Sequence, residues 1–258
     1  MTLTFYKYQG TGNDFIILDN RSGQFPKNNH NLVAKLCDRK FGIGADGLML
    51  LETETNFDFK MVYFNSDGAQ STMCGNGGRC LAAFAKSIGV IDNEGLFNAV
   101  DGSHEVLIKE DQVILGMKKV DEVQNKEKYF FLDTGSPHHV QFVSDTEKVN
   151  VNDQGAKLRY GIYGAQGANI NFVSLDSTGL HSIRTYERGV EGETLSCGTG
   201  VTAAAIAIHQ QNEAYTSPIS LHTKGGLLKV HFTKVGQGYS KIFLEGPAEF
   251  VFKGEISI

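Results

Sequence analysis

Two cysteines, Cys74 and Cys197, each begin a Cys-Gly-x-Gly pattern, written Cys-Gly-Asn-Gly at the first and Cys-Gly-Thr-Gly at the second. An Ala-rich run of helical character follows each pattern, so we expect each cysteine at the start of a helix. The backbone N–H groups and partial positive charge of a helix start stabilise a thiolate and bind a carboxylate. The glycines leave those N–H groups accessible. Each pattern therefore predicts a reactive thiol beside an anion site.

Two such sites suit one reaction, the inversion of a carbon centre. One cysteine, as thiolate, removes the α-proton from one face, and the other, as thiol, supplies a proton to the opposite face. The α-hydrogen of an amino acid is weakly acidic, so the developing carbanion needs N–H donors and helix dipoles on its carboxylate. We therefore expect a cofactor-independent amino-acid racemase or epimerase with Cys74 and Cys197 as its acid and base pair.

The other two cysteines, Cys37 and Cys80, are interpreted as small buried side chains within helical segments. Four cysteines without a C-x-x-C pair do not indicate a disulfide scaffold or structural zinc. A disulfide between Cys74 and Cys197 would be an inactive form rather than the function.

The elements that must position these thiols are duplicated. At an offset of 123 residues, Thr11-Gly12 matches Thr134-Gly135, Gly44-Ala45 matches Gly167-Ala168, and Tyr63 matches Tyr186. Cys74-Gly75 matches Cys197-Gly198 at the same offset. Such grouped identities predict two copies of one unit. We expect domains at residues 1–118, joined by a tail at about 247–258, and at residues 119–246.

Each copy is predicted to be an α+β unit, in which a curled, mostly antiparallel, barrel-like sheet surrounds a central helix. We expect strands at Phe59–Phe64, Val106–Leu115, Ile170–Leu175, Leu227–Phe232 and Lys241–Leu244, and helices at Leu32–Lys40, Gly77–Ile88 and Thr199–Gln211. Two pseudo-symmetric copies without a Pro/Ser-rich linker are expected to share an active-site cleft.

Composition favours a small polar ligand over a nucleic acid or a membrane. The net charge is -5, and Lys118-Lys119 is typical of the short basic stretches present. An apolar run of membrane-spanning length is absent from the sequence, as is a signal-peptide pattern. We expect a cytoplasmic protein.

Other motif interpretations are weaker. Gly42-Ile-Gly44-Ala-Asp-Gly47 fits a dinucleotide pattern, but a predicted helix precedes it and a strand-like run follows. His138 and His139 are adjacent on a strand-like run and point to opposite faces, so a metal site is not expected. A cysteine protease or acyl-transfer enzyme could use Cys74 or Cys197 together with His138. This interpretation leaves the second Cys-Gly-x-Gly pattern unexplained. Pyridoxal-phosphate chemistry would need a lysine for the Schiff base, and no lysine in this sequence has a distinctive setting.

Motifs along the whole chain resemble those of the diaminopimelate epimerase family. They are Gly10-Thr-Gly-Asn-Asp-Phe15, Phe41-Gly-Ile-Gly-Ala-Asp46, Phe64-Asn-Ser-Asp-Gly68, Met73-Cys-Gly-Asn-Gly-Gly-Arg-Cys80, Pro137-His138, Asn169-Ile-Asn-Phe172, Tyr186-Glu-Arg-Gly189 and Gly192-Glu-Thr-Leu-Ser-Cys-Gly-Thr-Gly200. The resemblance implies interconversion of L,L- and meso-diaminopimelate without a cofactor or metal, in lysine and cell-wall precursor synthesis. It also implies a homodimer.

The resemblance assigns roles to individual positions. It implies that Cys74 and Cys197 are the acid and base, polarised by His138 and Glu187. The donors for the carboxylate of the reacting centre are Gly75, Asn76, Gly198 and Thr199. The polar ring around the rest of the substrate is Asn13, Asn65, Asn169, Glu187 and Arg188.

Three positions depart from the usual family pattern. Ser136 stands where Asn usually precedes Pro-His, Gly47 stands where some members carry Gln, and the stretch from Arg188 to Cys197 is one residue longer. These departures leave the exact substrate preference open. Two alternatives also remain, a racemase of another amino acid, like proline racemase, and a non-catalytic amino-acid-binding protein on the same scaffold.

Overall fold

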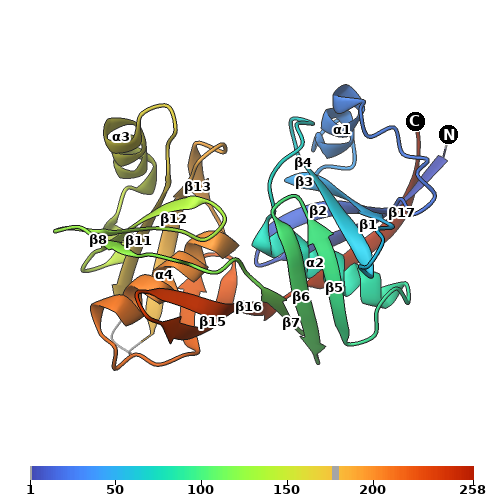
Figure 1. Ribbon diagram of the computed structural model, residues 1–258. Coiled ribbons are helices and arrows are strands. Elements are labelled where there is room, and N and C mark those ends of the chain that lie inside the picture. Colours follow the sequence, from blue (N-terminus) through green and yellow to red (C-terminus); the bar gives the residue numbers. More distant parts are fainter. Residues whose placement is uncertain (1, 176–179) are drawn as a thin grey trace. The chain divides into compact units, whose positions relative to one another are not determined.

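The computed structural model describes residues 2–175 and 180–258 (Figure 1). The chain folds as two units, one formed by the residues up to Leu115 together with Pro247–Ile258, the other by Gly116–Gly246. The domain boundaries drawn from the repeat stay a prediction.

In the first unit, a mixed sheet carries two helices as crossover connections. Helix α1 (His30–Cys37) follows β2, and α2 (Gly75–Ser87) follows β4. Parallel pairs, β2 with β3 and β4 with β5, alternate with antiparallel ones, and β17 pairs antiparallel with β1 at the sheet edge. The strands are β1 (Thr2–Gly10), β2 (Asn13–Asp19), β3 (Gly47–Glu52), β4 (Phe59–Asn65), β5 (Glu94–Ala99), β6 (Gly102–Lys109), β7 (Gln112–Gly116) and β17 (Glu249–Ser257).

The second unit repeats this order. Helix α3 (Val151–Tyr163) joins the parallel strands β10 and β11, and α4 (Gly198–Gln211) lies between β13 and β14 in the chain. A 3-10 turn, η1 (Thr146–Lys148), precedes α3. The strands are β8 (Gln124–Asn125), β9 (Phe130–Asp133), β10 (Pro137–Phe142), β11 (Asn169–Leu175), β12 (His181–Glu187), β13 (Gly192–Thr194), β14 (Ile219–Thr223), β15 (Gly226–Val235) and β16 (Gly238–Pro247). The predicted α+β duplication is confirmed.

Each sheet curls around one helix. Strands β9, β10, β11, β12, β14 and β15 all contact α4, whose residues from Gly200 to Ala207 are buried on every side. A helix that is apolar all round has no solvent face and must lie inside a core. In the first unit β1, β2, β3 and β17 contact α2, and Gly89 follows it with φ 71°, the left-handed conformation of a glycine helix stop. The cysteine-bearing helices are therefore the rigid centres of their units.

Two predicted elements differ from the structure, and one helix was missed. Helix α1 ends at Cys37 rather than Lys40, because Asp38 is extended and its side chain accepts from the N–H groups of Lys40 and Phe41. The expected single strand Val106–Leu115 is a hairpin, β6 and β7, whose turn contains Glu110 at φ 53°. Helix α3 was not predicted.

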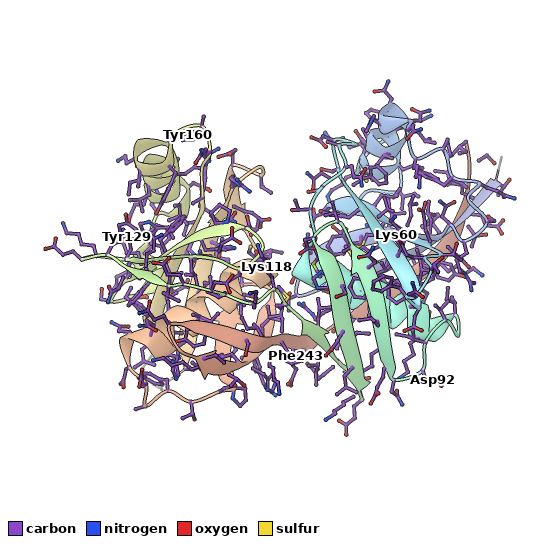
Figure 2. The ribbon with its side chains drawn as sticks, viewed as in Figure 1. Lys60, Asp92, Lys118, Tyr129, Tyr160 and Phe243 are labelled. Atoms are coloured by element: carbon purple, nitrogen blue, oxygen red, sulfur yellow. The ribbon has the colours of Figure 1, made fainter. Side chains whose placement is uncertain are left out.

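The sequence pattern did not indicate α3 because few of its residues are buried and its apolar periodicity is weak. Val151, Gly155 and Arg159 are the buried ones among its residues, and Tyr160 is 55% exposed on the surface (Figure 2). Among the residues that the structure describes, no helix is both long and apolar enough to span a membrane.

Candidate active site

Cys74 and Cys197 are the N-cap residues of α2 and α4. Both have extended backbone, and their carbonyl oxygens accept the first intrahelical hydrogen bonds, from Gly78 N at 2.7 Å and Val201 N at 2.9 Å. The N–H groups of the first turn precede those bonds and point out of the helix end. The predicted placement of both thiols at helix starts is confirmed.

The Cys74 thiol faces a carboxamide from another element. Asn13, the first residue of β2, places Oδ1 3.8 Å from the Cys74 Sγ and 3.5 Å from Asn76 Nδ2. Asn13 Nδ2 donates to Asp46 Oδ2 at 2.6 Å, which fixes the orientation of the carboxamide. A hydrogen-bond acceptor is thereby presented to the thiol and the helix start.

Asp46 is held in turn by a charged cluster. Arg39 donates to both Asp46 and Asp14, at 2.8 and 2.6 Å, and Lys7 forms an ion pair with Asp14 at 2.8 Å. Burial alone would raise the pKa of Asp14, but hydrogen bonds from Arg39 and Lys7 outweigh it and lower that pKa well below its usual range. The Asp14 carboxylate is therefore charged at any physiological pH.

At the second helix start, Thr199 stands at the repeat position of Asn76 and carries a hydroxyl. Thr199 Oγ1 lies 3.5 Å from the Cys197 Sγ, and the Thr199 carbonyl accepts from Thr134 Oγ1 at 2.9 Å. A Cβ at Gly200 would lie 2.5 Å from Asn171 Oδ1 and 3.4 Å from the Cys197 Sγ. Glycine is therefore required for this close approach of helix and strand.

His138 on β10 is fully buried, and burial lowers the pKa of its imidazole to about 3. Asn171 Nδ2 donates to His138 Nδ1 at 3.1 Å, while Asn171 Oδ1 accepts from Thr185 Oγ1 at 3.0 Å. Asn171 Nδ2 also donates to the His139 carbonyl at 2.9 Å, and a carbonyl can only accept, so this bond fixes which end of the amide faces the ring. The contact of Nδ1 with Asn171 is shorter than that of Nε2 with Asn169 Nδ2, at 3.5 Å, so Nδ1 is assigned as the acceptor and Nε2 carries the proton of the neutral ring. The His138 ring is therefore neutral, with its N–H at Nε2.

Asn169 joins the polar residues of the second unit. Its Nδ2 donates to Ser136 Oγ at 3.1 Å, and its Oδ1 accepts from Arg188 N at 2.8 Å. At the repeat offset, Asn169 and Ser136 are the counterparts of Asp46 and Asn13. In each unit, a hydrogen bond therefore joins the starts of two parallel strands. It joins Asn13 on β2 to Asp46 just before β3, and Ser136 just before β10 to Asn169 on β11.

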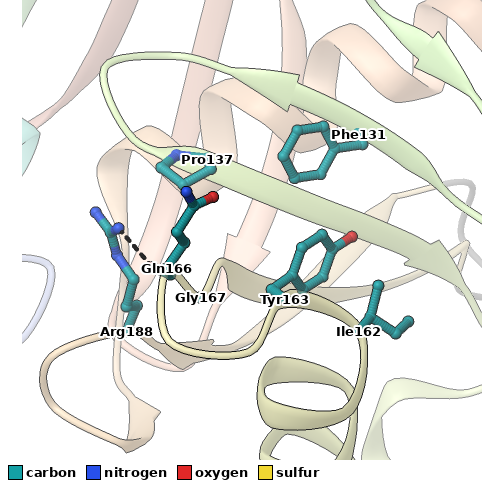
Figure 3. Close-up of a pocket in the computed structure, with 7 residues that line it drawn as sticks. All are labelled: Phe131, Pro137, Ile162, Tyr163, Gln166, Gly167 and Arg188. Carbon is teal, nitrogen blue, oxygen red and sulfur yellow. Dashed lines mark hydrogen bonds between the residues drawn. The ribbon is translucent and has the colours of Figure 1, made fainter.

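Arg188 lies in the turn after β12 and is exposed. Its guanidinium donates to Gln166 O at 3.0 Å and to Ser136 Oγ at 3.3 Å. Arg188 also lines a cavity of about 470 Å³, and Figure 3 shows the position of its side chain among the lining residues. The cavity is lined by Phe131, Pro137, Ile162, Tyr163, Gln166, Gly167 and Arg188, so it includes neither Cys197 nor His138 and is not the position of a reacting carbon.

Hydrogen bonds from α3 hold the turn between Arg188 and Gly192. The Glu191 carboxylate accepts from Arg159 at 3.1 Å and from Tyr160 at 3.0 Å. Glu191 has φ 55°, so these bonds hold a strained backbone in the turn. Glu187, at the end of β12, is half-buried and accepts from Thr194 Oγ1 at 3.0 Å.

The predicted residues of each unit come together to different degrees. In the first unit, Asn13 contacts both Cys74 and Asn76. In the second, Asn169 contacts His138 through Nδ2, at 3.5 Å, and accepts from Arg188 N through Oδ1. Asn65 ends β4, and its carbonyl accepts from Gly68 N at 2.9 Å. Gly75 and Gly198 are buried in the first turns of α2 and α4.

Three supporting residues received no role in the sequence analysis, namely Asp46, Asn171 and Arg79. All three lie inside motifs identified there. Asn171 is two residues from Asn169 on one strand, a spacing that places both side chains on one face. That periodicity was the available signal. For Asp46 and Arg79, the available signal was a charged side chain within a glycine-rich segment.

Two weaker interpretations are also resolved. Burial raises the pKa of both Cys37 and Cys80 to about 12, which confirms them as buried thiols. The glycine pattern at 42–47 lies between α1 and β3, so its predicted order of helix before and strand after is confirmed. Within residues 2–175 and 180–258, no three potential metal-ligating His, Cys, Asp or Glu side chains cluster.

Comparisons with known proteins agree on one family. A family model described as "Diaminopimelate epimerase" matches residues 5–123 and 130–251. The "Diaminopimelate epimerase" of Flavobacterium psychrophilum is 56% identical, covering 98% of this chain and 100% of the relative. That of Chlorobaculum tepidum is 39% identical, covering 96% of this chain and 99% of the relative.

Solved structures share the fold at low identity. A phenazine biosynthesis protein of the PhzF family from Bacillus anthracis has a TM-score of 0.80 at 14% identity, covering 100% of both chains. A hydroxyproline epimerase from Agrobacterium vitis has a TM-score of 0.73 at 14% identity, covering 100% of this chain and 93% of the other. At such identities the likeness concerns the fold alone.

Proposed function

The chain belongs to the diaminopimelate epimerase family, and we propose that it inverts the α-carbon of its substrate with two thiols, those of Cys74 and Cys197. Its activity is that of an isomerase of lysine biosynthesis, the interconversion of L,L- and meso-diaminopimelate. The observation that supports the thiol pair is their repeat-equivalent placement at the N-caps of two buried helices.

The proposed step balances without a cofactor. One thiolate takes the α-hydrogen as a proton, and its electron pair stays on the α-carbon, delocalised into the carboxylate. The opposite thiol then gives its own proton to the other face of the carbon, so the first sulfur ends with the substrate's original proton and the second ends as a thiolate. The N–H donors that we assign to the carboxylate belong to Gly75, Asn76, Gly198 and Thr199, where helix dipoles stabilise the added negative charge.

His138 and Glu187 are proposed to polarise the thiols. Because the His138 ring is neutral with its proton on Nε2, we assign it a hydrogen bond to a developing anion rather than the role of base. Glu187, whose carboxylate is oriented by Thr194, is assigned to accept from the substrate ammonium.

The far end of the substrate is assigned to the polar ring of Asn13, Asn65, Asn169 and Arg188. A guanidinium binds a carboxylate through two parallel hydrogen bonds, and carboxamide oxygens accept from an ammonium. Arg188 is anchored by Ser136 and Gln166 in a position to turn toward such a carboxylate.

We also propose that two copies associate through β17. This edge strand exposes three consecutive apolar side chains, Phe250 at 54%, Val251 at 52% and Phe252 at 44%. Adjacent exposed apolar residues on a sheet edge are characteristic of a subunit interface. Phe252→Lys is expected to convert a dimer to a monomer in light scattering, whereas Val235→Lys on β15, where the side chain is 59% exposed, is expected to leave the mass unchanged.

A cytoplasmic location is proposed on chemical grounds. The mechanism needs both cysteines reduced, and cytosolic thiol buffers maintain that state. The substrate is a small amino acid, and no role is assigned to nucleic acid or membrane.

The direct test is turnover of L,L-diaminopimelate by the purified protein in the presence of a metal chelator and without added cofactor, followed by separation of the stereoisomers. Meso product is expected from the wild type, and Cys74→Ser and Cys197→Ser are expected to lose net inversion. Cys37→Ser serves as the matched control and is expected to retain activity. Inversion by either N-cap variant at the wild-type rate, or turnover of proline or hydroxyproline instead, contradicts the proposal.

A further inference from the structure

Arg79 is a buried cation for which the proposed reaction has given no role. Its side chain has no solvent exposure, although it is long and charged. Helix side chains lean toward the N-terminus, and the Arg79 guanidinium accordingly reaches back to the first turn of α2. There Nη1 donates to Gly75 O at 3.4 Å, next to Cys74, and Nη2 donates to Thr11 Oγ1 at 3.3 Å.

The hydrogen-bond partners of Arg79 are all uncharged. Besides Gly75 and Thr11, Nε donates to the carbonyl of Pro247 at 3.3 Å. Among the residues that the structure describes, no carboxylate forms an ion pair with Arg79. Burial lowers the pKa of Arg79 to about 10. Negative charge on Cys80 or Cys74 would act in the opposite direction and raise that pKa. A buried charge is unfavourable unless an opposite charge lies near it.

Of the two thiols that interact with Arg79, Cys74 is the one that can be the anion. Cys80 is fully buried, and burial raises its pKa to about 12, so it stays a thiol at physiological pH. Cys74 is partly exposed at the helix start. The remaining charges on nearby elements are Asp14 and Asp46, which are engaged by Lys7 and Arg39, and Glu249 on β17, an exposed carboxylate that accepts from Gln9 Nε2 at 2.8 Å.

The duplicated helix lacks this cation. At the repeat offset the counterpart of Arg79 is Thr202, which is also fully buried and donates to Gly198 O at 3.0 Å. The carbonyl one residue beyond the N-cap cysteine is therefore contacted from the same helix position in both units, by a cation in α2 and by a neutral hydroxyl in α4.

We infer that Arg79 is a positioning residue that holds Cys74 as the thiolate in the protein without substrate, so that Cys74 ionises at lower pH than Cys197. The inference rests on the proposed function, because it assigns the resting states of the two catalytic thiols. Cys74 is then the base toward the stereoisomer whose α-hydrogen faces it in the first turnover.

Iodoacetamide alkylation tests this on the full chain without substrate. The rate at each cysteine is measured from pH 5 to 10 by peptide mass spectrometry. In the wild type, the midpoint for Cys74 is expected about one pH unit or more below that for Cys197, a tenfold difference in thiolate fraction. Arg79→Met is expected to raise the Cys74 midpoint by about one unit, and Arg79→Lys to restore part of the shift. Thr202→Val, which changes no charge, is expected to move neither midpoint.

Equal midpoints in the wild type, or a lower midpoint at Cys197, overturn the inference even if Arg79→Met does not fold. A folded Arg79→Met with an unchanged Cys74 midpoint also overturns it. A merely structural Arg79 would alter stability without moving the pH profile of one thiol. Turnover of diaminopimelate with equal midpoints leaves the proposed function intact, whereas separated midpoints without turnover refute the proposed function instead.

Discussion

Acidification from pH 7 to pH 5 is expected to destabilise this protein through two neighbouring histidines. His138 and His139 have no solvent exposure. Burial, the largest cause in each case, lowers their pKa values from 6.5 to about 3 and about 4. Both rings are thus neutral in the folded chain at pH 5, whereas the same rings are mostly protonated in the unfolded chain.

The sign and size follow from proton linkage. Between pH 6.5 and pH 4 the unfolded chain binds more protons, so the free energy of unfolding increases with pH in this window. The full contribution is present above pH 6.5 and is lost as the pH falls. Because 1.5 pH units separate pH 5 from the unfolded pKa, each ring contributes a loss of about 2 kcal/mol at pH 5, about 4 kcal/mol for the pair.

Urea unfolding followed by circular dichroism at pH 7, 6 and 5 measures the effect. His139→Gln removes one ring that has no assigned role in catalysis and keeps polar atoms near its partner, Tyr163 Oη at 2.9 Å. The variant is expected to lose about 2 kcal/mol less than the wild type between pH 7 and pH 5. His222→Gln on β14, at an exposed position, is the matched control and is expected to retain the wild-type pH dependence.

An identical pH dependence in wild type and His139→Gln would refute the reasoning. So would a free energy of unfolding in the wild type that is flat from pH 7 to pH 5. The first result means that the His139 ring binds its proton as readily in the folded protein as in the unfolded chain. The second means the same of both rings, and the neutral state of His138 then loses its basis.

Further predictions concern the close contacts at the helix starts. Gly200→Ala places a Cβ 2.5 Å from Asn171 Oδ1, and the displaced helix start is expected to lower kcat roughly 100-fold, since an error near 1 Å has that effect. Gly161→Ala in α3, where a Cβ meets open space, is its control and should raise Tm by about 2 to 4 °C; a lower Tm contradicts this. Asp46→Asn weakens the charged bond that orients Asn13 and is expected to lower kcat at least about tenfold, with circular dichroism unchanged; wild-type kcat would exclude that orienting role.

The sequence was sufficient for the parts that depend on local patterns. A glycine after a cysteine at the start of an apolar, Ala-rich run specifies a helix N-terminus in either unit. The offset of 123 residues then makes the two helices equivalent. The same offset relates α3 to α1, and applying it element by element would have predicted the missed helix despite its sparse apolar residues.

Other features depend on tertiary contacts that periodicity does not encode. The β6–β7 turn rests on Glu110 in a left-handed conformation, which is uncommon for glutamate and gave no turn signal. The proton position on His138 is assigned from its contact with Asn171, which lies on the neighbouring strand β11 and is itself oriented by the His139 carbonyl. Arg79 resembles a surface helix residue in the sequence, and the sheet around α2 is what buries it.

Solvent deuterium incorporation by the single-thiol variants tests the two-thiol claim most directly. A lone thiolate can exchange only the α-hydrogen that faces it, so Cys74→Ser and Cys197→Ser are each expected to label one stereoisomer of diaminopimelate, opposite in the two variants, without inversion. Labelling of the same stereoisomer by both variants, or inversion by either one, would contradict a mechanism with one thiol on each face of the carbon.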